Sequence, residues 1–202
     1  MQLSPARLAA DALRLLPRKR ISRALGAIAK TRAPQPLVSR AIDAFVSAYD
    51  VDMAQAIVPS GGYRSFDDFF TRALEPGARP IDADPSVIIS PADGKIEDFG
   101  AVDLAASVTV KGKPYRVGDL LGDVGLGDAY QGGNYFIVYL SPRDYHRVHT
   151  PVAGRVTAAR HVPGTLYPVN RIGTDFVPRL FARNERVVTL QDSPEHGQVV
   201  TI

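Results

Sequence analysis

The chain has 202 residues, with 45% hydrophobic and 22% charged side chains, and these values are typical of a globular protein of one or two domains. It contains no cysteine, which excludes disulfides and thiolate metal sites and fits a reducing compartment. No stretch approaches the roughly 20 consecutive apolar residues of a membrane-spanning helix, and Asp11 and Arg14 interrupt any signal-peptide core; the default expectation is a cytoplasmic protein.

The N-terminal part of the chain is strongly basic. The first 40 residues contain nine Lys or Arg side chains and one acidic residue, so they carry a charge of +8, whereas the remaining residues carry −5. Apolar residues recur here at the spacing of one helix face, after a helix start at Ser4 and Pro5. We predict three short amphipathic helices, with apolar positions at Leu8, Ala12, Leu15 and Leu16, then Ile21, Leu25 and Ile28, then Leu37, Ala41, Ile42, Phe45 and Tyr49.

Two interpretations of this basic segment remain open. In the first, a helical hairpin packs on the rest of the protein and its cations are solvated. In the second, the helices lie in an anionic membrane interface, where each nearby Lys or Arg contributes about 1 kcal/mol. The near absence of aromatic residues argues against nucleic-acid binding. We treat residues 1–64 as a basic amphipathic helical membrane-association region and residues 65–202 as a second, mainly β region.

From Ser65 onward the pattern changes to short strands. Ser65 and Asp68 resemble a capped helix start, and we expect this helix to run to about Leu74. Turns rich in Gly, Pro and Asp then separate strand-like segments at residues 87–89, 95–99, 107–110, 135–140, 155–161, 187–190 and 198–202. The expected fold class is α+β, with short amphipathic helices followed by a mainly antiparallel β barrel or sandwich-like region. Because the last strand meets the chain end, we expect a truncated sequence.

One short pattern occurs twice, sixty residues apart. The segment from Ser90 to Ile96 (SPADGKI) parallels the segment from Thr150 to Val156 (TPVAGRV). A hydroxyl residue, proline, glycine, a base and a β-branched residue recur in the same order, which favours two related turn-then-strand units in a compact β domain such as a lipoyl-type domain. Pro-x-x-Gly is also common turn chemistry. The informative difference is Asp93 in the first copy against Ala153 in the second.

The residues best suited to chemistry follow a predicted strand, on a Ser-Pro turn. Two of the four histidines, His146 and His149, lie there, and one helical turn after Pro142 would place them on one face. A histidine with a carboxylate partner can act as a general base. Asp144 is adjacent in sequence, but Asp93, on its own tight turn, is the more distinctive partner.

Two alternatives for these histidines remain open. They can be partly buried, structural and merely hydrogen-bonded, or they can join Asp93 in a zinc site, for which His-x-x-His alone is weak support. A nucleophile is missing, because the sequence has no Gly-x-Ser-x-Gly elbow and Ser141 precedes a proline in the turn.

The sequence resembles the phosphatidylserine decarboxylases from about residue 40 to its end. Several blocks match that family in order, and the histidine-containing block is too long for chance agreement. The matching blocks are Ser65–Arg72 with Leu74, Pro80–Ile81, Ser90–Lys95, Tyr139–His149, Leu166–Asn170 and Leu180–Arg186.

The resemblance implies an enzyme, a carboxy-lyase of phospholipid biosynthesis made as a zymogen. In that family an Asp–His pair and the serine of a Gly-Ser motif drive self-cleavage and leave a covalent pyruvoyl group. Asp93 matches the carboxylate, His149 the base, and His146 a substrate-binding histidine. The pyruvoyl ketone forms a Schiff base with the amine of phosphatidylserine and acts as the electron sink, and the product is phosphatidylethanolamine.

The sequence contains no Gly-Ser dipeptide, so the pyruvoyl-forming serine is absent from it. We therefore expect the chain alone to be inactive and to require a complementary C-terminal pyruvoyl-bearing chain. The other implied partners are phosphatidylserine and an anionic membrane surface, with peripheral attachment at the cytoplasmic face of the cell membrane. Neither nucleic acid nor a metal is expected, and a homodimer is one option for the assembly. The alternative function is a non-catalytic membrane-surface lipid-binding module.

Overall fold

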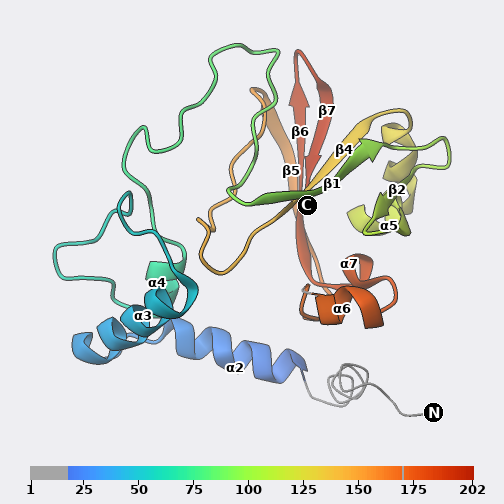
Figure 1. Ribbon diagram of the computed structural model, residues 1–202. Helices are drawn as coiled ribbons and strands as arrows, with labels where there is room; N and C mark the ends of the chain where they lie inside the picture. Colours follow the sequence, from blue (N-terminus) through green and yellow to red (C-terminus); the bar gives the residue numbers. More distant parts are fainter. Residues whose placement is uncertain (1–17, 170) are drawn as a thin grey trace, which may run out of the picture.

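The computed structural model describes residues 18–169 and 171–202. The helices of the N-terminal part gather at one end of the molecule, and the sheets lie at the other end together with the shorter helices of the C-terminal part (Figure 1). The first of the three predicted amphipathic helices lies outside the described residues. The other two are confirmed as α2 (Arg18–Lys30) and α3 (Gln35–Tyr49).

The helical end is held together by apolar and aromatic side chains. Helix α3 has prolines at its start, where their fixed φ suits the first turn, and ends at Asp50 in the left-handed conformation. Helix α4 (Phe66–Phe70) is capped by the Ser65 hydroxyl, which accepts a hydrogen bond from the Asp68 amide. The predicted start of α4 is confirmed, but it ends at Phe70 rather than near Leu74. One buried cluster joins these elements, formed by Val38, Ile42, Val51, Tyr63 and Phe69.

The β region consists of three small antiparallel sheets. Strands β1 (Lys95–Ala101) and β4 (Asn134–Tyr139) form one, β2 (Ser107–Val110) and β3 (Lys113–Arg116) the second, and β5 (Arg155–Val162), β6 (Arg186–Ser193) and β7 (Gly197–Thr201) the third. The α+β class is confirmed. No closed barrel forms within the described residues, so the finer barrel prediction is not supported.

Most predicted strands are present, and the errors fall in short segments. The predicted strand over 87–89 is wrong, because these residues are extended without ladder partners. Strand β3, with Pro114 inside it, was not predicted. Neither were four short helices that follow strands or loops, namely α5 (Val117–Leu121), the 3-10 helix η1 (Val124–Tyr130), α6 (Arg171–Phe176) and α7 (Leu180–Arg183).

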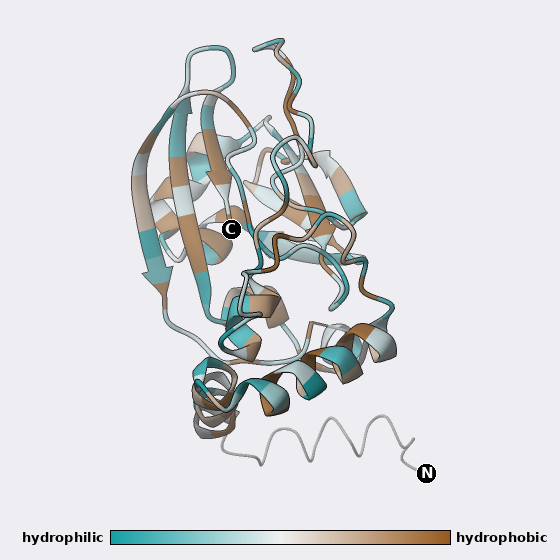
Figure 2. Ribbon diagram, turned by 90° about the vertical axis from the view of Figure 1, so that its left-hand side faces the viewer, coloured by the Kyte–Doolittle hydropathy of each residue, from teal (hydrophilic) through white to brown (hydrophobic). Residues whose placement is uncertain are grey.

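A second hydrophobic core lies between the sheets and α5. Leu121 and Val188 are fully buried in it, and Tyr135 and Ile137 reach it from β4. The opposite face of the β1–β4 ribbon is apolar but exposed: Phe99 pairs across the ribbon with Phe136, and their exposed fractions are 76% and 42%. Figure 2 shows apolar (brown) and polar (teal) segments following one another along the strands.

The repeated sequence pattern is a repeated structure. Gly94 and Gly154 have φ values of +141° and +151°, and each leads into a strand, β1 or β5. Both strands carry a register shift at the same place, between Ile96 and Asp98 in β1 and between Val156 and Ala158 in β5. Two turn-then-strand units with the same bulge therefore lie sixty residues apart.

Candidate active site

The two repeated turns bind each other through their backbones. The His149 amide donates to the Pro91 carbonyl at 2.7 Å, and the Ile89 amide donates to the Pro151 carbonyl at 3.0 Å. The two donors, Ile89 and His149, occupy equivalent positions of the repeat, and so do the two acceptors, Pro91 and Pro151. Each turn therefore donates one backbone hydrogen bond to the other and accepts one from it. The backbone alone therefore brings the turn that carries Asp93 beside the turn that carries the histidines.

Asp93 is engaged by an arginine from a separate loop. The Arg79 Nε donates to both Asp93 oxygens, at 2.8 and 2.9 Å, and Nη2 adds a bond at 2.5 Å. Gln55 accepts from Arg79 Nη1 at 2.7 Å, so it orients the guanidinium. The hydrogen bond to Asp93 raises the pKa of Arg79, and the fork geometry of Arg fixes the carboxylate in one orientation.

His149 has a different partner, the phenol of Tyr145. Its Nε2 lies 3.0 Å from the Tyr145 hydroxyl, and the two rings stack at 5.6 Å. Tyr145 is buried, whereas His149 is exposed. Within the part of the chain that the structure describes, no hydrogen bond or ion pair joins Asp93 to His149. The predicted pairing of these two side chains stays a prediction, although their turns are in contact.

His146 points the other way, into the helical end. Its ring stacks on Phe70 with centroids 4.0 Å apart, and its Nε2 is buried without a hydrogen-bond partner. Burial lowers the pKa of His146, and the Arg72 charge lowers it further, while the carbonyl of Pro142 and the charge of Asp144 act against this shift. The imidazole is therefore held neutral, with one open nitrogen.

The predicted helical turn after Pro142 is wrong. Residues 142–149 contain no helix, because Asp144 closes the chain into a tight turn instead. Its amide donates to the Ser141 carbonyl at 3.0 Å, and its carboxylate accepts from the Ser141 amide at 2.6 Å. His146 and His149 consequently face different neighbours and do not share one helix face.

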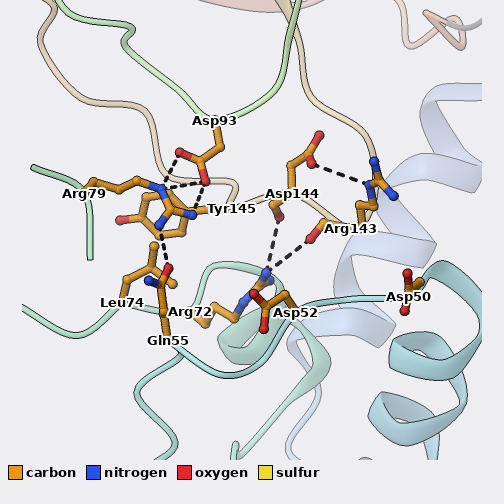
Figure 3. A pocket seen from close by; sticks show the side chains of 10 residues that line it. All are labelled: Asp50, Asp52, Gln55, Arg72, Leu74, Arg79, Asp93, Arg143, Asp144 and Tyr145. Atoms are coloured by element: carbon orange, nitrogen blue, oxygen red, sulfur yellow. Dashed lines mark hydrogen bonds and ion pairs between the residues drawn. The ribbon is translucent and has the colours of Figure 1, made fainter.

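A cavity of 320 Å³ lies between the two turns and the loop that follows α3 (Figure 3). Four carboxylates and three guanidinium groups line it, so it can hold a ligand that carries both charges. Its lining residues are Asp50, Asp52, Gln55, Arg72, Leu74, Arg79, Asp93, Arg143, Asp144 and Tyr145.

Residues 18–169 and 171–202 contain no group of three or more His, Asp or Glu side chains placed to hold a metal ion such as zinc.

Sequence reasoning missed three residues of this site. Arg79 belongs to no charge pattern, and only the fold brings it to Asp93 across 14 residues. Tyr145 stands four residues before His149, and this spacing is the sequence signal that the two side chains can meet. Arg72 follows the short helix α4 directly, and no pattern in the neighbouring sequence predicts that this arginine is buried.

The arrangement defines a class of site. Asp93 and Tyr145 both line one polar cavity, and Tyr145 contacts the exposed imidazole of His149. A carboxylate and an imidazole on neighbouring turns are groups that can supply general acid–base chemistry on an α+β scaffold.

The comparisons with known proteins give the family. A family model of phosphatidylserine decarboxylase matches residues 66–202, and the chain belongs to this family. It is 46% identical over 190 residues to the phosphatidylserine decarboxylase proenzyme of Bordetella pertussis, and 47% identical over 181 residues to that of Azotobacter vinelandii. These alignments cover 93% and 89% of this chain, but 63% of the length of each relative.

Proposed function

We propose that this chain forms part of a decarboxylase that converts phosphatidylserine to phosphatidylethanolamine. The observation that carries the proposal is the pair of backbone bonds that holds the turn of Asp93 against the turn that begins at His149. The family match and the two-signed cavity support it, because a serine headgroup carries an ammonium, a carboxylate and a phosphate.

In this proposal His149 is the general base of self-cleavage. Its imidazole takes the proton of a serine hydroxyl supplied by the part of the family polypeptide that this chain does not match. Asp93 is the carboxylate that orients and stabilises the imidazolium. Because Arg79 and Tyr145 hold these two side chains in the described state, at least one of the two contacts must yield when Asp93 and His149 pair.

His146 is proposed to act on the substrate. Its Nε2 is buried and unpartnered, so it can accept a proton from, or return one to, a reacting group without first losing a protein partner. The lowered pKa keeps it neutral near neutral pH, and neutral imidazole can serve as a base.

The residues present fit a pyruvoyl cofactor. An unpartnered buried nitrogen on His146 and the exposed ring of His149 are groups that could hold its carbonyl and move protons beside it. When bound, a pyruvoyl group supplies an electron sink for loss of carbon dioxide. The chain supplies the orientation and the proton transfer.

The β1–β4 ribbon is the proposed contact for a complementary pyruvoyl-bearing chain. A two-stranded sheet is marginally stable by itself, and this one exposes the cross-strand pair of Phe99 and Phe136. A further β segment packed on this face would bury both rings.

Helix α2 is the proposed contact with an anionic membrane. Leu25 and Ile28 have exposed fractions of 60% and 69%, and the same helix carries basic residues along its length. Among the described helices, none is long and apolar enough to cross a membrane. Cations beside an exposed apolar row favour peripheral attachment.

Reconstitution tests this function. The 202-residue chain is combined with the part of the Bordetella pertussis relative that it does not match, and phosphatidylethanolamine formation from phosphatidylserine vesicles is measured. We expect turnover that is lost in His149→Ala. Vesicle binding without any turnover would reject the enzyme and favour the lipid-binding module.

A further inference from the structure

The end of helix α4 grips the histidine turn through three consecutive residues. Phe70 stacks on His146. The carbonyl of Thr71 accepts a hydrogen bond from Arg147 Nε at 2.8 Å. Arg72 Nη2 donates to the carbonyls of Arg143 and Asp144, at 3.3 and 3.5 Å.

Arg72 is unusual among these contacts because it is a buried cation. Its exposed fraction is 3%, and its Nε and Nη1 have no hydrogen-bond partner. Within the described residues it forms no ion pair at direct contact. Burial lowers the pKa of Arg72, and the carboxylates of Asp52, Asp93 and Asp144 oppose this shift only from a distance; the face of Phe69 adds a cation–π contact, with its ring centre 5.4 Å from the guanidinium carbon. A charge in this setting is expensive, and an apolar residue of similar volume would often be at least as stable.

The position of Arg72 therefore needs an explanation other than stability. We propose that Arg72 is a positioning residue that fixes the backbone of residues 143–146, so that His146 stays stacked on Phe70 and its buried Nε2 stays without a protein partner. The catalytic meaning of this role rests on the proposed function, because it assumes that the histidine turn takes part in the reaction.

The charges around His146 agree with this geometry. Arg72 acts on it from the segment just after α4 and disfavours the imidazolium, whereas Asp144, on the turn itself, favours it. Phe70 closes the remaining face with an apolar ring. A cation fixed on that side helps to keep the imidazole neutral, as well as fixing where it lies.

The test compares two arginines of the same neighbourhood by NMR on the 202-residue chain. In Arg72→Gln, we expect amide exchange of residues 144–147 to rise about tenfold or more, and the His146 ring protons to lose the upfield shift that stacking on Phe70 gives them. The pKa of His146 should rise, because a repelling cation is gone. The matched control is Arg143→Gln, whose side chain is 63% exposed and reaches Asp144 only at 4.0 Å, so it should change these signals far less than Arg72→Gln.

The methyl signals of Val38 and Ile42 report on the core beside α4 and should stay unchanged in Arg72→Gln. If Arg72→Gln does not fold, Arg72→Lys is measured in the same way, since it keeps the charge but has a smaller donor group; the same amides should exchange faster than in the wild type. Spectra of either folded variant that match Arg143→Gln would overturn the proposal. None of these readouts needs turnover, so failure of the decarboxylase assignment would show separately, in the reconstitution.

Discussion

The two repeated turns have nearly the same backbone and very different side chains. Residues 89–96 and 149–156 share the positive-φ glycine, the bulge in the following strand and the reciprocal bonds to each other. However, Asp93 corresponds to Ala153 in the second turn, and His149 corresponds to Ile89 in the first turn. Asp93 and His149 are the polar residues whose counterparts in the other turn are apolar, whereas the hydroxyl residues and the bases occur in both turns.

This difference separates scaffold from chemistry. A duplicated backbone can hold two turns together without specifying any reaction, because its bonds run between amides and carbonyls. In the proposed function, the chemistry enters where the two sequences differ, at Asp93 and His149. Substitutions at paired positions can therefore test the comparison directly.

The largest expected effect is on the reaction. In the reconstituted enzyme, His149→Ala should slow self-cleavage by about 100- to 10,000-fold, the range for loss of a general base. The equivalent change in the other turn, Ile89→Ala, should alter the rate only a few-fold. Self-cleavage is followed by gel electrophoresis; equal losses in both variants would mean that the turns are equivalent in function as well as in backbone.

The next largest effect is on stability, and it should be the same in both turns. A Cβ added at Gly94 would lie 2.4 Å from the Tyr139 carbonyl oxygen, and one at Gly154 would lie 2.2 Å from that of Asp192. We expect Gly94→Ala and Gly154→Ala each to lower the free energy of unfolding by about 2–4 kcal/mol. Urea denaturation measures both.

Gly77→Ala is the control for this pair, because it also has positive φ but nothing lies within 4 Å of its added Cβ. It should lose only about 1 kcal/mol from backbone strain. A loss confined to one of the two repeated turns would contradict their structural equivalence.

A smaller effect concerns Arg79, which only the first turn engages. Arg79→Met removes the ion pair with Asp93, whose partners are 48% and 25% exposed, so the free energy of unfolding should fall by at most about 1 kcal/mol. Freeing Asp93 should in turn speed self-cleavage if the Arg79 contact restrains it. A slower reaction would show instead that Arg79 orients Asp93 productively.

The smallest effect is a pH dependence of stability from His146. Its pKa is lowered in the folded state from 6.5, so the unfolded chain binds the proton more readily. Stability is therefore complete above about pH 6.5 and falls as the pH drops through the folded-state pKa. His146→Asn should flatten this part of the stability curve, measured by urea denaturation between pH 7 and pH 5.

Local patterns predicted the elements and the scaffold better than the side-chain contacts. The helices at Ile21–Ile28 and Leu37–Tyr49, the Ser65 cap and most strands follow from periodicity and turn chemistry. The repeated turn was visible as a repeated sequence. Residues 87–89 misled because an apolar run without a ladder partner looks the same as a strand in sequence.

The partners of Asp93 and His149 could not be read from sequence. Arg79 reaches Asp93 only because the loop after α4 returns to the β region, and Tyr145 reaches His149 although the residues between them form no helix. Both outcomes depend on the geometry of loops, for which residue spacing carries little information.

The backbone hydrogen bonds between the two turns also determine when, during synthesis of the chain, the site can form. Pro91 and His149 are far apart along the chain, so a ribosome must release the whole intervening stretch before they can meet, and closing so long a loop is entropically unfavourable until the strands on both sides have paired. During synthesis, Asp93 therefore emerges well before the turn that begins at His149 is available to pack against it. In the proposed function, self-cleavage can therefore begin only after the β region has folded.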